Sequence, residues 1–203
     1  SDGDELGYIV FGGTTDGTAA SPVYDYNSAA IVASADGDWD TAGFDSGSKM
    51  QFLTTPDGSS ANSVQMVIRG SGNVGIGTQD PDELLHVSSD VSSDGNIKIS
   101  QHNNDPDGPN LILSKSQGTE ETPLSVTDGD WLGSIQFYGY DGSSESMWAG
   151  IFSSADANGG ALIDGTAHPS DLSFWTTEQG STSITNRLII RHDGKVGINT
   201  TTP

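Results

Sequence analysis

One unit of sequence occurs twice in this chain of 203 residues, and the repeat limits the folds open to it. Residues 2–11 return as residues 128–137, and both segments begin with the pattern Asp-Gly-Asp-x-Leu-Gly. The other repeated segments keep the same order: residues 50–55 with 172–177, 66–69 with 188–191, and 72–78 with 194–200. Repeats of this kind indicate structural units that stack on their neighbours along an axis.

The repeat divides the chain into three parts. We interpret residues 1–81 and 128–203 as two β repeats, each ending in a glycine-rich motif, and residues 82–127 as an intervening β segment. The counterpart of the intervening segment would lie upstream of Ser1. We therefore expect the chain to be a piece of a longer repetitive protein.

The chain is predicted to be all-β, with little or no α-helix. Short runs rich in Val, Ile, Phe, Tyr and Thr alternate with Gly, Asp, Asn and Ser, and no long window has helical spacing. Asp-Gly pairs, which favour turns with positive φ, occur at residues 16–17, 57–58, 141–142 and 193–194. The predicted strands cover residues 8–11, 29–33, 50–54, 64–69, 74–77, 84–87, 97–100, 111–114, 132–138, 147–152, 171–176, 187–191 and 196–198.

Composition restricts the partners of the chain. A formal net charge of −21 disfavours nucleic acids and anionic lipid surfaces, because like charges repel. No apolar run approaches the roughly 18 residues that a membrane-spanning helix needs. The sequence has no cysteine, which excludes disulfides and thiolate metal sites. We expect neither nucleic-acid binding nor membrane insertion.

The glycine-rich motif places glycines at alternate positions of a predicted strand, at Gly75 and Gly77. One face of that strand then carries Val74 and Ile76, and the other face carries no side chain. A bare face indicates close packing against another backbone, for which copies of the same segment around a fibre axis are one candidate. The alternative is that these glycines serve only turns or bulges. The second copy has Asn199 in place of Gly77, which predicts a looser approach there.

Residues 70–75 also match the dinucleotide-binding pattern G-x-G-x-x-G. That fingerprint requires a helix immediately afterwards, because the helix N-terminus holds the pyrophosphate. The sequence Val-Gly-Ile-Gly-Thr does not begin a helix, and the second copy has His192 in place of the first glycine. We therefore expect no nucleotide cofactor.

Two acidic loops raise the question of a metal. Carboxylate and amide oxygens alternate at Asp36, Asp38 and Asp40, and again at Asn103, Asp105 and Asp107. Such loops supply some of the six to eight oxygens that Ca²⁺ prefers, but neither loop has the glutamate or the flanking helices of an EF-hand. Solvated turns are the favoured interpretation, so we expect no cofactor, and Ca²⁺ at these six residues is the alternative.

The sequence contains no recognisable catalytic motif. None of the histidines lies in an H-E-x-x-H pattern, and no G-x-S-x-G nucleophile elbow is present. We therefore expect the chain not to be an enzyme. Four tryptophans could act as sugar-stacking platforms or as packing residues, with Trp39 the best candidate for exposure: Trp39, Trp131, Trp148 and Trp175.

The glycine-rich motif and its flanks resemble a motif of tailed-phage tail fibres, also found in related bacterial surface fibre proteins. The resemblance rests on Ile68-Arg69, residues 72–78, Pro81 and residues 84–87, while residues 128–142 and 172–177 are similar to two further fibre elements. It implies an elongated homotrimeric β fibre on the outside of a virion, which contacts other fibre or virion proteins and spaces or presents a receptor-binding tip. The alternatives are a carbohydrate-binding adhesin module on a bacterial surface and a glycan-cleaving fibre domain, and in each case host surface glycan is a candidate partner.

Overall fold

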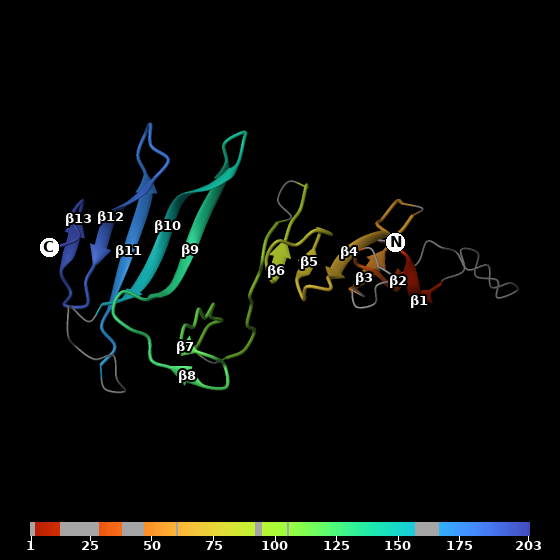
Figure 1. Cartoon of the computed structure of the whole chain (residues 1–203), viewed down its shortest axis with the longest axis horizontal. Helices are drawn as coiled ribbons and strands as arrows, with labels where there is room; N and C mark the ends of the chain where they lie inside the picture. The colour runs from red at the N-terminus through yellow and green to blue at the C-terminus, as the bar shows by residue number, and fades with distance from the viewer. Residues whose placement is uncertain are drawn as a thin grey trace, which may run out of the picture. The chain divides into compact units, whose positions relative to one another are not determined.

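The computed structural model describes residues 3–12, 29–37, 47–59, 61–91, 95–104, 106–156 and 167–203. Every regular element among these residues is a β-strand, which confirms the all-β prediction. No helix in these ranges is long and apolar enough to cross a membrane. The chain divides into two compact units, Ser1–Ile99 and Ser100–Pro203, and each contains one copy of the sequence repeat (Figure 1).

The first unit contains a six-stranded sheet whose strands are neighbours in chain order. The first five strands pair antiparallel, and the sixth adds to the fifth in parallel. The strands are β1 (Glu5–Phe11), β2 (Ala29–Ala35), β3 (Ser48–Thr54), β4 (Ser63–Ile68), β5 (Val74–Ile76) and β6 (Leu85–Val87). Runs rich in β-branched residues that alternate with polar residues favour these strands.

The second unit repeats this arrangement with longer strands. Its antiparallel sheet contains β9 (Trp131–Tyr140), β10 (Glu145–Ala155), β11 (Ser170–Thr177), β12 (Ile184–Ile190) and β13 (Val196–Ile198). Strands β9 to β13 correspond in order to β1 to β5. A small separate pair, β7 (Gln117–Gly118) and β8 (Pro123–Leu124), precedes this sheet and was not predicted.

Two predicted strands are wrong. Residues 97–100 and 111–114 belong to no strand of the structure, and their apolar side chains are exposed. Their composition suits a strand, but a strand also needs a neighbouring ladder to satisfy its backbone groups. The described part of the chain supplies no such ladder at either segment.

The Asp-Gly turns follow the prediction wherever they are described. Gly58, Gly142 and Gly194 have φ values of 77°, 99° and 82°. Asp16-Gly17 lies outside the described residues. Asn199 has a φ of 54°, the left-handed conformation that asparagine tolerates better than most residues.

Candidate functional site: two apolar sheet faces and their charged clusters

A row of five apolar side chains crosses each sheet, one from every antiparallel strand. The first apolar row is Ile9, Ile31, Phe52, Met66 and Ile76. The second apolar row is Ile135, Ile151, Phe174, Leu188 and Ile198. Directly paired residues on neighbouring strands point to the same face, so each row marks one continuous apolar face.

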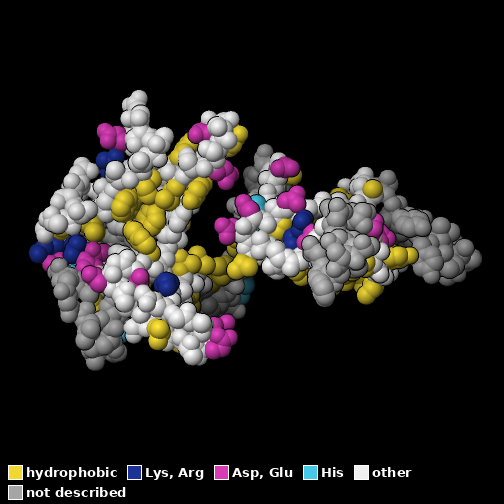
Figure 2. All heavy atoms as spheres, in the orientation of Figure 1, with side chains coloured by type: hydrophobic (Ala, Val, Ile, Leu, Met, Phe, Trp, Pro, Cys, Tyr) yellow, Lys and Arg dark blue, Asp and Glu magenta, His cyan; other side chains and the backbone are white. Residues whose placement is uncertain are grey.

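No described segment of the chain fully buries these rows. Each of the ten side chains is exposed or half-buried, and Ile9 and Ile198 are 60% and 71% exposed. Figure 2 shows hydrophobic side chains gathered over the second sheet. Large exposed apolar faces mark protein–protein or membrane interaction sites or ligand-binding grooves.

The opposite face of each sheet holds most of the small core. Val67 is fully buried there, and its counterpart Ile189 is also buried. The partners of these residues on the last antiparallel strand are Gly75 and Gly197. A Cβ built on Gly75 would overlap the carbonyl oxygen of Thr78 and lie 3.1 Å from Cγ1 of Val67.

The bare glycine face therefore has a backbone partner within its own chain. In the second copy the carbonyl oxygen of Thr200 takes the place of Thr78, and Cγ2 of Ile189 lies 3.0 Å from the Cβ position of Gly197. The loop after the strand folds back over the glycine in both copies. Packing of these glycines against neighbouring chains stays a prediction, and the intrachain contact already explains why no side chain is present.

Arg69, which follows β4, contacts three parts of the first unit. Its Nη2 lies 2.8 Å from Oδ1 of Asp36, which follows β2, and its Nε donates to Oδ2 at 3.1 Å. Its Nη1 donates to the carbonyl of Gln79 at 3.0 Å and lies 3.1 Å from the carboxylate of Asp80. The backbone N–H of Gly70 donates to Asp36 Oδ2 at 2.7 Å. Arg69, which forms an ion pair with Asp36, thus fixes the loop that covers Gly75.

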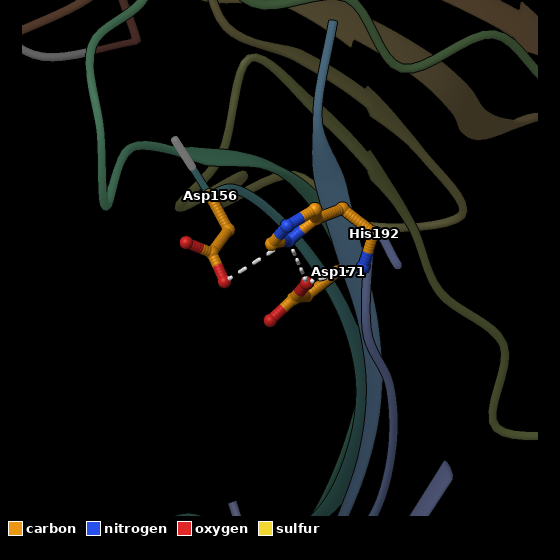
Figure 3. Close-up of side chains that lie close together, drawn as sticks. All are labelled: Asp156, Asp171 and His192. Atoms are coloured by element: carbon orange, nitrogen blue, oxygen red, sulfur yellow. Dashed lines mark hydrogen bonds and ion pairs between the residues drawn. The ribbon is translucent and has the colours of Figure 1, made fainter. Parts of the chain in front are cut away.

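In the second copy, two carboxylates, Asp156 and Asp171, take the place of Asp36 beside the arginine. Figure 3 shows these two carboxylates beside His192. Arg191 Nη2 lies 2.5 Å from Oδ2 of Asp156, and Arg191 Nε lies 3.3 Å from Oδ2 of Asp171. The backbone N–H of His192 donates to Asp171 Oδ1 at 2.9 Å. Arg191 Nη1 donates to the carbonyl of Thr201, as Arg69 does to Gln79.

The environment of Asp171 changes its acidity. Burial of its carboxyl raises its pKa, and so does the nearby carboxyl of Asp156. The bond from the His192 N–H and the charge of Arg191 act in the opposite direction. The imidazole Nδ1 of His192 lies 3.6 Å from Asp156 and 3.7 Å from Asp171.

Asp156, Asp171 and His192 could each offer one ligand atom to a metal ion, with the three atoms within 4.8 Å of one another. The guanidinium of Arg191 lies against both carboxylates, so a cation would have to compete with it. The arrangement works as an ion-pair network that joins β10, β11 and the turn after β12.

Of the six residues named as the alternative Ca²⁺ ligands, the structure describes Asp36, Asn103 and Asp107. Asp36 is held by Arg69 and Gly70, so its carboxylate is neutralised by an ion pair. Asn103 and Asp107 lie in segments that belong to no strand and are exposed. Asp38, Asp40 and Asp105 lie outside the described residues. Ca²⁺ binding at these loops stays a prediction.

Sequence reasoning missed one repeated segment. Residues 34–36 and 154–156 both read Ser-Ala-Asp, at the ends of β2 and β10. Their backbones make matching bonds: Ala35 N–H donates to Asp4 and Ala155 N–H donates to Asp130, both at 2.8 Å. This short match contains Asp36, which pairs with Arg69, and Asp156, which pairs with Arg191. Alignment of the two copies around these aspartates would have found it.

The aromatic residues of the second unit form a separate cluster. The rings of Trp131 and Phe152 lie 5.1 Å apart edge to face, and Trp175 lies 5.8 Å from Phe152. Trp175 is half-buried and Trp131 is 51% exposed. Trp39 lies outside the described residues.

Comparison with protein-family models finds no match, and comparison with curated proteins finds none either. Two solved structures are similar in fold. One is the carboxy-terminal domain of the bacteriophage T5 L-shaped tail fibre, with a TM-score of 0.77 and 16% identity over 100% of this chain and 82% of that chain. The other is the same domain with its intra-molecular chaperone domain, with a TM-score of 0.79, 16% identity and 100% coverage of this chain.

The chain has the fold of a phage tail-fibre domain. It spans 56% of the T5 chain that includes the chaperone domain.

Proposed function

We propose that this chain is a structural segment of a phage tail fibre, located in the virion, which spaces or presents a host-receptor-binding tip. The observation that carries the proposal is the pair of unburied apolar rows, one on each sheet. Burying a large apolar side chain stabilises a protein by about 1.5–3 kcal/mol. Ten such side chains give association between copies a large driving force.

The proposed assembly is a homotrimer. A closed rotational symmetry turns the same apolar face of every chain toward a shared axis, which buries the face without creating an open-ended polymer. It also brings sheet edges close to neighbouring chains, where exposed edges are protected from unwanted pairing. The similarity in fold to the T5 tail-fibre domain supports assembly into a fibre. The number of chains in the assembly is tested by experiment.

Measurement of the mass in solution tests the proposal. We expect light scattering coupled to size-exclusion chromatography to give three times the 21.0 kDa of one chain at micromolar concentration. A folded monomer would contradict the assembly, and a dimer would contradict threefold symmetry.

The proposal gives the chain no catalytic step. The acidic groups of the charged clusters are engaged by arginine: Asp36 by Arg69, and Asp156 and Asp171 by Arg191. A carboxylate held in this way serves structure, because a general acid or base must be able to exchange a proton with a substrate. The proposed partners are other copies of the chain and other fibre or virion proteins.

A second candidate function is a carbohydrate-binding adhesin module on a bacterial surface. One observation favours it: an exposed tryptophan, Trp148, lines a hollow together with a carboxylate and several hydroxyls. This function would make a host or surface glycan the partner, and it is compatible with a fibre that also contacts glycans along its length.

A further inference from the structure

A hollow of about 370 Å³ lies at one end of the second sheet. Figure 1 shows that the β9–β10 turn and the β11–β12 turn both lie at this end. We name the hollow the Trp148 pocket, and its lining residues are Asp141, Ser146, Trp148, Thr177, Ser181 and Thr182. The lining thus combines one indole ring, one carboxylate and four hydroxyls.

The indole of Trp148 is fixed against the backbone of the neighbouring strand. A Cβ built on Gly139 would lie 2.8–2.9 Å from three atoms of the ring, so the absence of a side chain at Gly139 makes room for the ring. The indole N–H donates to the hydroxyl of Ser146 at 3.0 Å, and the hydroxyl of Thr177 donates to the Trp148 carbonyl at 3.1 Å. Trp148 nevertheless remains 51% exposed.

The backbone irregularity at Trp148 contributes to this position. The pairing of β10 with β9 shifts register between Met147 and Ala149, which leaves Trp148 opposite no partner residue. Bulges of this kind redirect a side chain away from the regular alternation of a strand. The result is a ring that rests on Gly139 while much of its surface faces solvent.

Asp141 supplies a permanent negative charge beside the ring. Its Oδ1 accepts the backbone N–H groups of Ser143 and Ser144 at 2.8 and 2.9 Å. These two bonds lower the pKa of the Asp141 carboxyl, so the group is ionised at neutral pH. An ionised carboxylate accepts strong hydrogen bonds from hydroxyl and amide donors.

We propose that the Trp148 pocket binds a neutral hexose unit of a glycan, an inference that deepens the glycan partner of the proposed function. A pyranose ring has an apolar C–H face that can lie on the indole and hydroxyls that can donate to Asp141. The hydroxyls of Thr182 and Ser181 offer further donors and acceptors. The charge of Asp141 and the net charge of −21 disfavour sugars that carry a carboxylate.

The experiment uses the full chain on an array of oligosaccharides built from glucose, galactose or N-acetylglucosamine, with glucuronic-acid oligosaccharides as the acidic counterpart. We expect neutral oligosaccharides to bind and the acidic ones to bind more weakly. We expect Trp148→Ala and Asp141→Asn each to weaken binding by about tenfold or more, because each removes one of the two main contacts. Thr182→Val removes a hydroxyl with little change in shape and gives a smaller loss.

Trp131→Ala is the matched control, because Trp131 is also 51% exposed and lies outside the pocket. It should leave glycan binding unchanged. The inference is overturned if no neutral oligosaccharide binds, if Trp148→Ala binds as the unmodified chain does, or if acidic oligosaccharides bind equally well. The mass of each sample separates the two proposals: a trimer that binds no glycan contradicts the pocket alone, whereas a monomer contradicts the proposed assembly.

Discussion

The carbonyl oxygen of Ser88 lies where a side chain on Gly77 would begin. Ser88 follows β6, and its N–H donates to the carbonyl of Ile76, at the end of β5, at 2.9 Å. Gly77 is therefore required twice, by its φ of 75° and by the approach of a neighbouring backbone. Asn199 has the same type of conformation in the second copy, where β13 pairs with β12 alone among the described strands.

We expect Gly77→Asn to disrupt the pairing of β6, although asparagine tolerates positive φ. Overpacking of this kind typically costs about 1–3 kcal/mol. Hydrogen exchange at the Ser88 amide measures the effect, and its protection should fall. The matched control is Asn199→Gly, which should leave the melting temperature almost unchanged. Unchanged protection of Ser88 in Gly77→Asn would refute the steric argument.

Replacement of the buried glycines should affect both copies alike. Gly75→Ala and Gly197→Ala each place a methyl group on a carbonyl oxygen, Thr78 or Thr200, and we expect each to cost about 1–3 kcal/mol. The sequence favoured a milder effect at Gly197, but the neighbours of the two glycines are nearly identical. Thermal unfolding at fixed protein concentration measures the loss. A loss at Gly75 without one at Gly197 would show that the copies differ in packing.

Charged substitution in an apolar row should prevent assembly. Phe174→Asp and Phe52→Asp place a carboxylate at the centre of the second and first rows, and burying an unpaired charge is strongly unfavourable. We expect a shift from trimer to smaller species in light scattering. Gln65→Glu makes the chain more negative by the same amount at an exposed position of β4, and it should remain assembled. An assembled Phe174→Asp protein would exclude this face from the interface.

The pH dependence of stability should report on Asp171. Its pKa is raised above the ordinary value of 3.8, so the folded state favours the protonated form. The resulting stabilisation is complete below the unfolded-state pKa and is lost as the pH rises through the folded-state value. Asp171→Asn keeps an acceptor for the His192 N–H and cannot ionise. The melting temperature of this variant minus that of the unmodified chain should therefore increase between pH 3 and pH 7, and a constant difference would contradict the assignment.

Salt should stabilise the assembled protein. Three chains together carry a formal charge of −63, three times −21, and their repulsion opposes association. The screening length falls from about 30 Å at 0.01 M salt to about 10 Å at 0.1 M. We expect the melting temperature to rise with NaCl over this range. A melting curve that does not respond to NaCl would remove repulsion as a factor in assembly.

The sequence by itself determined the strands that alternate apolar and polar residues and the turns that need positive φ. Both properties depend on residues that are adjacent in the sequence. The equivalent strands β3 and β11 illustrate the first, and the positive φ of Gly58 and Gly194 illustrates the second. The repeat also predicted two equivalent sheets, because equal patterns favour equal pairing.

Tertiary structure decided what each motif residue contacts. The partner of Gly75 is a carbonyl three residues later, and Arg69 joins Asp36 to the loop after β5; these contacts depend on how strands and loops meet in space. The same dependence explains why residues 97–100 and 111–114 form no strand, and why Trp148 lies beside hydroxyl groups from the β11–β12 turn. Local sequence sets which conformations a segment favours, whereas a ladder, an ion pair or a pocket exists only when a second segment is brought beside the first.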